Sequence, residues 1–545
     1  MQRINDTLKY ARFSIGLRKF LREKVTLDQA REDIKRRLQE REANFLRIAE
    51  KGIFGYPKSP YLPLLKRAGC EFVDLRDSVR RRGLEFALRE LREAGVGVNF
   101  EQFKGREPIE CDGKSYYLTS REFDNPFLKQ SYYGTTGGST GKAARVAFDL
   151  DAMTAQASQN LITAEVHGTL GMPRGMWRGV LPNMLGVGGL LSGAKVGNVP
   201  LRWFTPLMKE DRRPSLKYGL ANEWIVRLGR FYGEPFPFPE PVRLDEAVVI
   251  ARWVAQTVKE RGSCHMSAFA SMSLRIALAA IENDIDLTGA VLAGGGEPPT
   301  ETKVNTIRKS GARQRSGYSF SEVGAVGRAC ANPIDCNDQH FMRDHLALLQ
   351  FPRKVPGTDI EVQAFNFTTL LATAKKILLN VEIDDYGIVE ERSCGCLLEE
   401  YGFTEHLREI RSFRKLTGEG MSLIGSEMET ILFKTLPERF GGSALDYQLV
   451  EEEDEHGFTR LSIHVSPKIE IESEDVLIET ILTGLGRESS IADGARAMWK
   501  QAKTLQVKRS DPIWTERGKL MPLHLVKLQS KKDSAAAESP GRESS

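Results

Sequence analysis

The chain has 545 residues, and this length allows several domains and a large active site. Hydrophobic residues make up 41% and charged residues 28% of the sequence, a composition that excludes an intrinsically disordered protein. The formal net charge is only +4, and basic residues are interleaved with acidic ones, so we expect no nucleic-acid partner.

The first part of the chain indicates a cytoplasmic protein. Residues 1–21 carry lysines and arginines throughout and lack the uninterrupted apolar stretch of a signal peptide. The most apolar segment, residues 181–199, is interrupted by glycines, a proline and a lysine, so it predicts no membrane helix and no membrane partner. Seven cysteines in such a chain predict reduced thiols or a metal site rather than a disulfide framework.

Helical patterns come first and are followed by an alternation of strands and helices. Apolar residues recur at helical spacing over residues 27–50 and 79–94, and Gly95 is placed where a helix would stop. Further along, a helix is predicted over residues 271–283, and short apolar runs predict strand ends at residues 179–182, 262–265, 290–293 and 315–318. This alternation predicts an α/β domain with a substantial sheet.

The pattern changes near Arg411 and indicates a small α+β domain. The expected elements are helices over residues 425–436 and 476–485 and a hairpin formed by residues 447–450 and 458–465. The acidic run 451–455 is interpreted as the solvated tip of that hairpin rather than as a metal site.

A loop rich in glycine and hydroxyl residues precedes an apolar run. Glycines let backbone N–H groups approach an anion closely, and hydroxyl and lysine side chains add donors, so the loop is suited to holding phosphates. It is not a Walker A loop, because Thr136 replaces the first glycine and Ala143 follows the lysine. A flexible surface turn is the alternative interpretation. The loop comprises Thr135, Thr136, Gly137, Gly138, Ser139, Thr140, Gly141 and Lys142.

Four further segments follow the loop in a definite order. Residues 294–298 read Gly-Gly-Gly-Glu-Pro, residues 318–322 Tyr-Ser-Phe-Ser-Glu, residues 384–387 Asp-Asp-Tyr-Gly and residues 515–519 Thr-Glu-Arg-Gly-Lys. Together with the loop they resemble the motifs of the adenylate-forming superfamily of acyl-CoA synthetases and adenylation domains. The closest branch looks like the phenylacetate-CoA ligases, and the resemblance spans about residues 116–527. Asp384 stands where that family usually has glycine.

The resemblance implies an α/β fold with a large N-terminal domain of mixed sheets and helices and a small α+β C-terminal lid domain. The expected parts are a helical N-terminal region over residues 1–110, an ATP- and acid-binding core over 111–411, a mobile domain over 412–527 and a disordered tail over 528–545. The small domain would rotate between two half-reactions. Residues 412–414 lack the Asp or Lys that commonly marks the hinge.

The resemblance also implies an enzyme, an AMP-forming acid–thiol ligase. It would activate a carboxylic acid with ATP, release pyrophosphate from an acyl-adenylate step, and transfer the acyl group to a thiol, with CoA as the preferred acceptor. Transfer to a carrier protein or an amine is one alternative. A non-catalytic nucleotide-binding protein is a second alternative.

Each matched residue has a role that its chemistry allows. Lys519 can stabilise charge on the carboxylate and the α-phosphate, and Glu322 can hold a Mg²⁺ that bridges phosphate oxygens, so these two are the expected catalytic residues. A surface lysine and a helix-capping acid are the structural alternatives. Asp385 can accept from both ribose hydroxyls, or cap a turn. The expected nucleotide-binding set is the loop from Thr135 to Lys142 with Gly295, Gly296, Glu297, Pro298, Tyr318, Ser319, Ser321, Asp385 and Arg411.

Five of the seven cysteines lie between residues 264 and 396, which suggests a zinc site. Some relatives in the phenylacetate-CoA ligase branch look similar in carrying a Cys-His pair and a Cys-x-Cys pair in this region. The preferred ligand set is Cys330, His340, Cys394 and Cys396, with Cys336 as a substitute for Cys330. Buried free cysteines are the alternative interpretation.

The acid-binding pocket is expected where small residues dominate, in segments 183–189, 267–271, 294–296 and 318–323. No basic residue there marks a charged substrate, so aromatic and aliphatic acids both stay open. Lys503, Lys508 and Arg509 offer a basic surface for CoA, or a solvated face. The sequence sets neither the acceptor nor the oligomeric state, for which a homodimer is one option.

Overall fold

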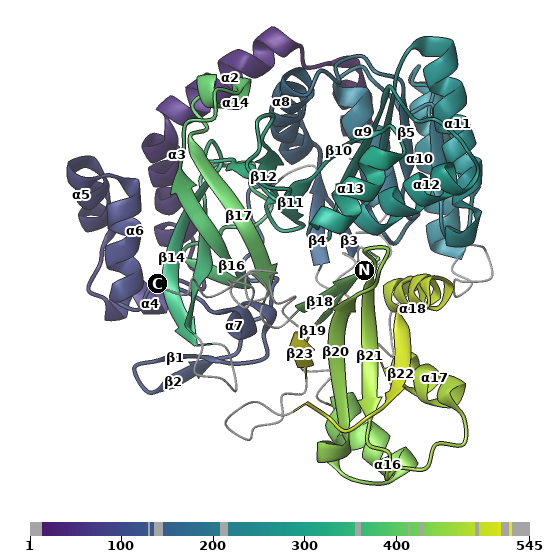
Figure 1. Ribbon diagram of the computed structural model, residues 1–545. Coiled ribbons are helices and arrows are strands. Elements are labelled where there is room, and N and C mark those ends of the chain that lie inside the picture. The colour runs from purple at the N-terminus through teal and green to yellow at the C-terminus, as the bar shows by residue number, and fades with distance from the viewer. Residues whose placement is uncertain are drawn as a thin grey trace, which may run out of the picture.

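The computed structural model describes most of the chain (Figure 1). The described residues are 13–128, 131–135, 145–207, 216–354, 361–412, 415–419, 421–424, 430–484, 490–513 and 523–525. They form a large N-terminal part with two main sheets and a small C-terminal part with one, which is the α/β fold class that the sequence predicts. Within these ranges, no helix has the length and apolar character needed to cross a membrane.

Helices form the beginning of the large part. They are α2 (Leu27–Gln39), α3 (Arg41–Ile48), the π-helical η1 (Ala49–Phe54), α4 (Leu62–Arg67), α5 (Phe72–Arg82), α6 (Leu84–Glu93) and α7 (Phe100–Lys104). Thr26 opens α2 with a capping box, since its Oγ1 accepts from the N–H of Gln29 at 3.3 Å. Gly83, with φ of 90°, separates α5 from α6, so the helical pattern over residues 79–94 spans two helices, and α6 ends at Glu93, just before the predicted stop at Gly95.

A six-stranded parallel sheet forms one half of the large part. Its strands, in spatial order, are β10 (Arg313–Arg315), β9 (Ala290–Gly295), β8 (Cys264–Phe269), β5 (Arg174–Trp177), β6 (Arg202–Thr205) and β7 (Pro239–Pro241). The chain winds outward from β5 through β6 to β7, then returns to β8 and winds the other way. The strand order therefore reverses between β5 and β8, the place where open α/β sheets bind ligands at the carboxyl ends of their strands.

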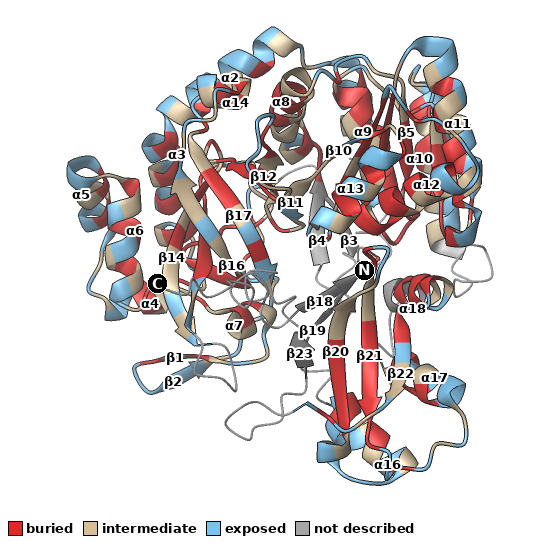
Figure 2. Cartoon of the chain, viewed as in Figure 1, coloured by how far each residue is buried: buried red, intermediate tan, exposed pale blue. Residues whose placement is uncertain are grey.

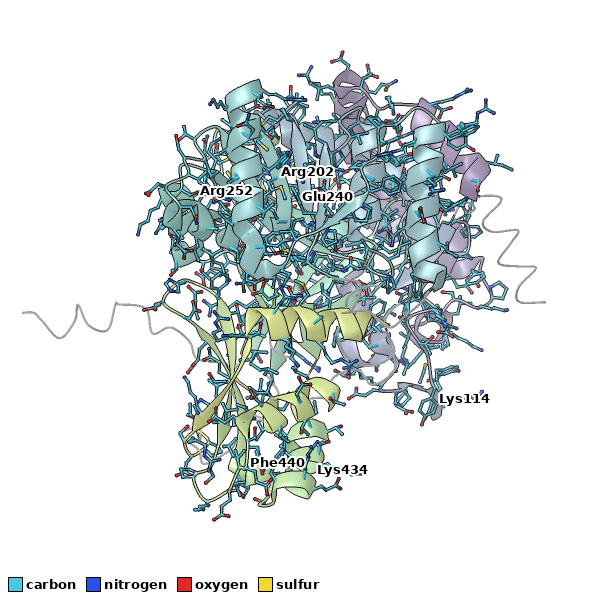
Figure 3. The ribbon with its side chains drawn as sticks, turned by 90° about the vertical axis from the view of Figure 1, so that its right-hand side faces the viewer. Lys114, Arg202, Glu240, Arg252, Lys434 and Phe440 are labelled. Atoms are coloured by element: carbon cyan, nitrogen blue, oxygen red, sulfur yellow. The ribbon has the colours of Figure 1, made fainter. Side chains whose placement is uncertain are left out.

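Helices cover this sheet (Figure 1). They are α9 (Leu185–Lys195), α10 (Leu216–Phe231), α11 (Ala247–Arg261), α12 (Ala270–Glu282) and α13 (Glu301–Lys309). At the β6–β7 edge, Arg202 Nε donates to Glu240 Oε1 at 2.9 Å; Figure 3 labels both residues.

The second sheet of the large part is antiparallel. Its order is β11 (Gly317–Phe320), β12 (Gly324–Ala329), β13 (Gln339–Phe341), β17 (Glu405–Ser412), β16 (Val381–Glu391), β15 (Glu361–Thr369) and β14 (Leu346–Lys354). Helix α8 (Leu150–Val166) packs against β12 and α2, and the short α14 (Leu397–Glu400) packs on α8. Two small hairpins complete this part, β1 (Ile109–Cys111) with β2 (Lys114–Tyr116) and β3 (Ser131–Thr135) with β4 (Arg145–Asp149).

The small part begins after β17. It contains the hairpin of β18 (Lys415–Gly418) and β19 (Met421–Ile424), then η3 (Ile431–Thr435), α16 (Leu436–Phe440), η4 (Ala444–Asp446), β20 (Tyr447–Glu453), β21 (Thr459–Val465), α17 (Glu474–Gly484), α18 (Ser490–Ala502), β22 (Leu505–Arg509) and β23 (Leu523–Leu525). The sheet order is β22-β21-β20-β23. The predicted hairpin is therefore present, and the predicted helix over residues 476–485 corresponds to α17.

Buried residues of the two parts, coloured red in Figure 2, belong to one hydrophobic cluster. One hydrophobic cluster runs from Phe204 of the parallel sheet to Trp499 of α18 and Leu461 of β21. At its edge, Gln501 Nε2 donates to the carbonyl oxygen of Pro206 at 3.2 Å. The small part is therefore packed against the large one through α18.

One predicted strand end lies outside any strand. Residues 179–182 follow β5, which ends at Trp177. Pro182 has no backbone N–H to donate to a sheet, and the chain turns there toward α9. The apolar run in this segment instead fills a core with Val187 and Leu190 of α9.

Two helical glycines allow a test of this packing. A Cβ atom on Gly186 in α9 would stand 2.2 Å from the buried Trp203 ring, whereas one on Gly219 in α10 would face open space. We expect Gly186→Ala to destabilise the protein by roughly 1–3 kcal/mol, because the indole must move. Gly219→Ala should be neutral or stabilising by up to about 1 kcal/mol, since alanine favours helices.

Thermal unfolding followed by circular dichroism compares the two variants. Equal melting temperatures for Gly186→Ala and Gly219→Ala would contradict the close approach of α9 to Trp203.

Candidate functional site

Asp385 lies at the centre of a hydrogen-bonded group on the antiparallel sheet. Tyr318 Oη of β11 donates to Asp385 Oδ2 at 2.7 Å, and the Ser412 hydroxyl donates to Asp385 Oδ1. Burial, followed by the charge of Asp385, raises the pKa of Tyr318 well above its ordinary value. The phenol therefore stays protonated and fixes the carboxylate in one orientation.

The backbone beside Asp385 has an unusual shape. Asp384 has a φ of 74°, in the left-handed region that glycine adopts at little cost. The glycine expected here from the resemblance would adopt this conformation at lower cost than Asp384. Gly387 is required for a different reason, because a Cβ atom would stand 2.7 Å from the carbonyl oxygen of Arg408.

Glu322 lies directly after β11 and is surrounded by lysines. Its Oε1 accepts from Lys104 Nζ of α7 at 2.9 Å, and Lys375 Nζ donates to the neighbouring Ser321 carbonyl at 3.3 Å. Although burial disfavours the charged form, Lys104 and Lys376 outweigh it and hold the pKa of Glu322 at about 2. The carboxylate is therefore charged at neutral pH, as a ligand for a divalent cation must be. The sequence pattern gave no sign of Lys104, which lies 218 residues away in the chain.

The turn after β9 is held by packing and by polar contacts. A Cβ atom on Gly294 would stand 3.0 Å from Ala270 Cα, and Gly296 has a φ of 83°. Glu297 is buried, where its Oε1 accepts from Ser271 Oγ at 2.7 Å and its Oε2 lies 3.8 Å from Lys303 Nζ. The Glu297 side chain therefore points into the protein and shapes the turn, while Gly296 and Pro298 are exposed.

The β20–β21 hairpin of the small part reaches this turn. Thr300 Oγ1 donates to Glu453 Oε1 at 3.1 Å, and Arg275 of α12 lies 4.4 Å from the centre of the Phe458 ring. Burial raises the pKa of Glu451 to about 7, with Lys303 opposing and Glu297 adding to the shift. The prediction of a solvated tip is therefore wrong for Glu451, because the hairpin packs against the large part.

Several predicted site residues lie outside the described residues. They are Thr136, Gly137, Gly138, Ser139, Thr140, Gly141, Lys142 and Lys519. Thr135 ends β3, and Arg411 is exposed on β17 opposite Tyr386 of β16. Ser319 is exposed beside Tyr318, and Ser321 is partly buried. The described part of the site thus joins Tyr318 to Asp385, and Glu322 follows Tyr318 by four residues in the chain.

Two hollows of the protein differ in their distance from these site residues. A cavity of about 40 Å³ is lined by Gln156, Val323 and Lys375, next to Glu322. A wider depression of about 730 Å³ lies on the small part, between α16 and α17, and shares no residue with the group. The smaller cavity is the one that adjoins the chemistry.

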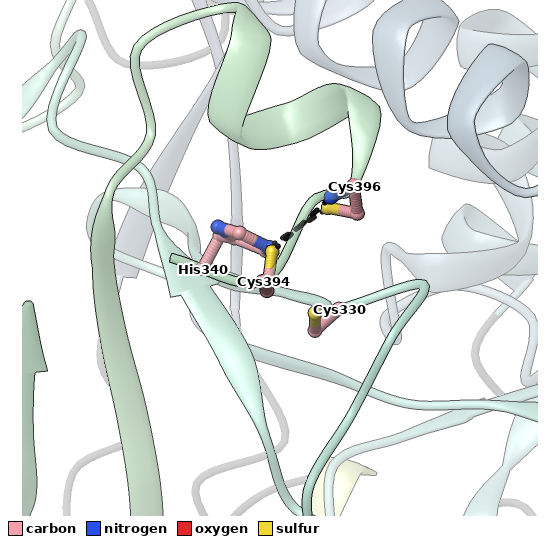
Figure 4. Close-up of side chains that lie close together, drawn as sticks. All are labelled: Cys330, His340, Cys394 and Cys396. Atoms are coloured by element: carbon pink, nitrogen blue, oxygen red, sulfur yellow. Dashed lines mark hydrogen bonds between the residues drawn. The ribbon is translucent and has the colours of Figure 1, made fainter. Parts of the chain in front are cut away.

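The four predicted zinc ligands converge (Figure 4). The ligand atoms of Cys330, His340, Cys394 and Cys396 all lie within 4.8 Å of one another. His340 Nε2 lies 3.1 Å from Cys396 Sγ and 3.6 Å from Cys394 Sγ, while its Nδ1 lies 2.6 Å from the carbonyl oxygen of Phe403. Such a carbonyl partner fixes the tautomer in which Nε2 can bind a metal.

The donor set of this cluster fits zinc. Three sulfurs and one imidazole make a closed tetrahedral set. Hydrogen bonds from Cys330 and His340 lower the pKa of the Cys396 thiol, which favours the thiolate that a metal needs. The proposed substitute, Cys336, is placed elsewhere, with its Sγ 3.6 Å from the carbonyl oxygen of Pro299.

The cluster lies apart from the Asp385 group. Strand β16 runs from Asp385 to Glu391 before the turn that carries Cys394, and a strand rises roughly 3.3 Å per residue, so the separation is about 20 Å. The cluster ties the end of β12 and strand β13 to the turn before α14.

Comparison with known proteins establishes the fold. No family model and no curated protein sequence matches the chain. Among solved structures, a 2-hydroxyisobutyryl-CoA ligase in complex with 2-HIB-AMP and CoA, in the thioesterification state, has a TM-score of 0.54 at 13% identity, and the match covers 92% of each chain. An amide bond synthetase variant from Marinactinospora thermotolerans has a TM-score of 0.41 at 12% identity, over 91% of this chain and 94% of that one. The chain therefore shares its fold with the 2-hydroxyisobutyryl-CoA ligase.

The raised pKa of Glu451 predicts a pH effect on stability. Because the folded state holds a proton between the ordinary pKa of 4.5 and about 7, stability should fall as pH rises through this window. In Glu451→Gln, a neutral amide replaces the protonated acid, so this loss should be smaller. Melting temperatures of both proteins at pH 5 to 8 measure the difference. Parallel curves for the two proteins would rule out Glu451 as the titrating group.

Proposed function

We propose that this protein activates a carboxylic acid with ATP, forms an acyl-adenylate with release of pyrophosphate, and transfers the acyl group to the thiol of CoA. The observation that carries the proposal is the Asp385 carboxylate held by Tyr318 and Ser412, on a fold shared with a 2-hydroxyisobutyryl-CoA ligase. CoA as acceptor is supported by the 2-hydroxyisobutyryl-CoA ligase, whose structure contains an acyl-AMP and CoA.

Asp385 is assigned to the ribose. An ionised carboxylate can accept hydrogen bonds from two adjacent hydroxyls, and Tyr318 and Ser412 hold it in one orientation for that purpose. Arg411 is assigned to the ribose or a phosphate, because its side chain is exposed next to this group. The turn formed by Gly295, Gly296, Glu297 and Pro298 would border the adenine.

Adenylation requires an oxygen of the acid to bond to the α-phosphorus while the bond to pyrophosphate breaks. Glu322 is the residue that we assign to Mg²⁺, which when bound neutralises phosphate charge. Lys104 balances the charge of Glu322. For Mg²⁺ to bind, Lys104 would have to move away or share the carboxylate with the ion. The loop from Thr136 to Lys142 is assigned to the β- and γ-phosphates, and Lys519 to the charge that develops on the reacting oxygens.

In the second half-reaction the thiolate attacks the acyl carbonyl carbon and AMP leaves. We propose that the large domain ends at residue 411 and that the small domain rotates between the two half-reactions, which the end of β17 at Ser412 supports. Of the basic residues considered for CoA, Lys508 is paired with Glu452 and Arg509 with the carbonyl of Ile469, so both already serve the small part.

The first experiment is pyrophosphate release with ATP, Mg²⁺ and a panel of carboxylic acids, with and without CoA. Asp385→Asn should lower acid-dependent release by about tenfold to a hundredfold, because one charged hydrogen-bond acceptor is lost. Lys519→Ala should lower it by about a hundredfold or more, as expected for a lost electrostatic contact in the transition state.

The exposed Lys434→Ala variant is the matched control and should behave as the original protein. Unchanged release in Lys519→Ala would remove the catalytic role of that lysine. Binding of ATP without release for any acid would favour a non-catalytic nucleotide-binding protein.

We further propose that Cys330, His340, Cys394 and Cys396 hold a structural Zn²⁺. Purified protein should contain about one zinc per chain, and replacement of Cys394 and Cys396 by serine should remove the metal and lower the melting temperature by several degrees. Cys336→Ser should keep the metal, because its sulfur lies outside the cluster. Metal analysis and thermal unfolding after chelation provide the measurement; unchanged stability after complete zinc removal would exclude a structural role.

A further inference from the structure

Arg178 lies at the point where the strand order of the parallel sheet reverses. It directly follows β5, and it contacts the end of β8, the neighbouring strand. Its Nη2 donates to Ser267 Oγ at 3.2 Å, and its guanidinium carbon lies 4.7 Å from the centre of the Phe269 ring. The residue therefore stands at the carboxyl edge of the sheet, between the two strands that border the expected ligand position.

The guanidinium has no anionic partner among the described residues. It contacts the neutral hydroxyl of Ser267 and the aromatic ring of Phe269. Burial lowers the pKa of Arg178 to about 10, yet the residue keeps part of its surface accessible. By contrast, Arg202 on the next strand is paired with Glu240. Burying a cation without an anionic partner costs free energy, so its presence indicates a functional role.

The surroundings add positive rather than negative charge. His265 and Ser267 of β8 point to the same face, because side chains alternate along a strand. Arg315 Nη2 lies 3.2 Å from His265 Nε2, on the side of the sheet that Arg178 occupies. Arg178 and Arg315 thus give this face an excess of positive charge that an anionic ligand would offset.

Arg178 also lies at a distance from the nucleotide residues. Phe269 of β8 pairs with Gly295 of β9, and a Cβ atom on Gly295 would stand 3.4 Å from the carbonyl oxygen of Gly317, which precedes Tyr318. The Arg178 guanidinium lies over the end of β8, on the β5 side of that strand, whereas Gly295 lies on the opposite side, roughly 5 Å further along the sheet. A group bound by Arg178 therefore lies on the β5 side of β8, while Tyr318 and Asp385 are reached across β9.

We propose that Arg178 binds a second anionic group of the acid, so that the substrate is a dicarboxylic acid with its far carboxylate on this arginine. This inference rests on the proposed acid activation. A planar guanidinium suits a carboxylate because two parallel N–H groups can donate to its two oxygens. The sequence expectation that no basic residue marks a charged substrate is revised accordingly.

The test compares dicarboxylic acids of increasing length with their mono-methyl esters, which have the same shape but lack the second charge. We expect the ratio of kcat/KM for diacid over half-ester in pyrophosphate release to be about 10 to 100 for the best length, as for a hydrogen bond to a charged group. Arg178→Gln should bring this ratio close to one. Arg178→Lys should keep part of it, because the charge remains but the paired donors are lost.

Arg202→Gln is the matched control, since it removes an arginine from the same sheet, and it should leave the ratio unchanged. The proposal would be overturned by a diacid-to-half-ester ratio near one in the original protein. It would also be overturned if Arg178→Gln lowered kcat/KM equally for the diacid and its half-ester, which would assign Arg178 a packing role. If Arg178→Gln does not fold, Arg178→Lys decides. A lower ratio of kcat/KM for diacid over half-ester in this variant would support the proposal, and an unchanged ratio would overturn it.

A binding measurement separates this proposal from the proposed function. Calorimetry with the same dicarboxylic acids, without ATP, should show binding to the original protein that is weakened at least tenfold by Arg178→Gln and less by Arg178→Lys. Binding without any pyrophosphate release would contradict acid activation and keep the anion site. Release with monocarboxylic acids, and no binding preference for diacids, would keep acid activation and overturn the anion site.

Discussion

The pairing of β5 with β8 determines where chemistry can occur in this protein. Because the chain winds away from these two strands in opposite directions, no connection crosses the carboxyl edge between them, and the edge is left for a ligand. The turn after β9 and the start of the antiparallel sheet border the same edge. The end of β9 lies next to Gly317 of β11, which brings Tyr318, and through it Asp385, to this edge.

Charge is distributed unevenly around this edge. Glu322 is held ionised by lysines from α7 and from the segment before β16, whereas Arg178 lies among neutral groups. The first arrangement balances a buried anion in advance, and the second leaves a buried cation to be balanced by something that binds. Both charged groups lie where little water surrounds them, so their interactions with other charges are strong.

The sequence predicted the fold class. It also singled out residues of the Asp385 group and of the cysteine–histidine cluster, but not the contacts that position them. Ordered motifs pointed to Glu322 and Asp385, and Cys-Gly-Cys with a nearby histidine pointed to the cysteine–histidine cluster, because the proposed chemistry and zinc binding both need particular residue types. Lys104 and Arg178 were missed because an isolated lysine or arginine has no local pattern, and only the fold reveals its neighbours. Gly83 interrupts a helix whose apolar spacing continues across it, so periodicity alone misplaced that boundary.

The β20–β21 hairpin joins the small part to the turn that carries Glu297. Its contacts with Thr300 and Lys303 mean that the position of the small part and the shape of the turn form one equilibrium. A ligand that binds one shape of the turn more tightly must shift the equilibrium position of the small part. By thermodynamic reciprocity, moving the small part must change the affinity of the turn for that ligand to the same extent. If the turn binds a ligand, the hairpin contacts would therefore couple that binding to the position of the small part.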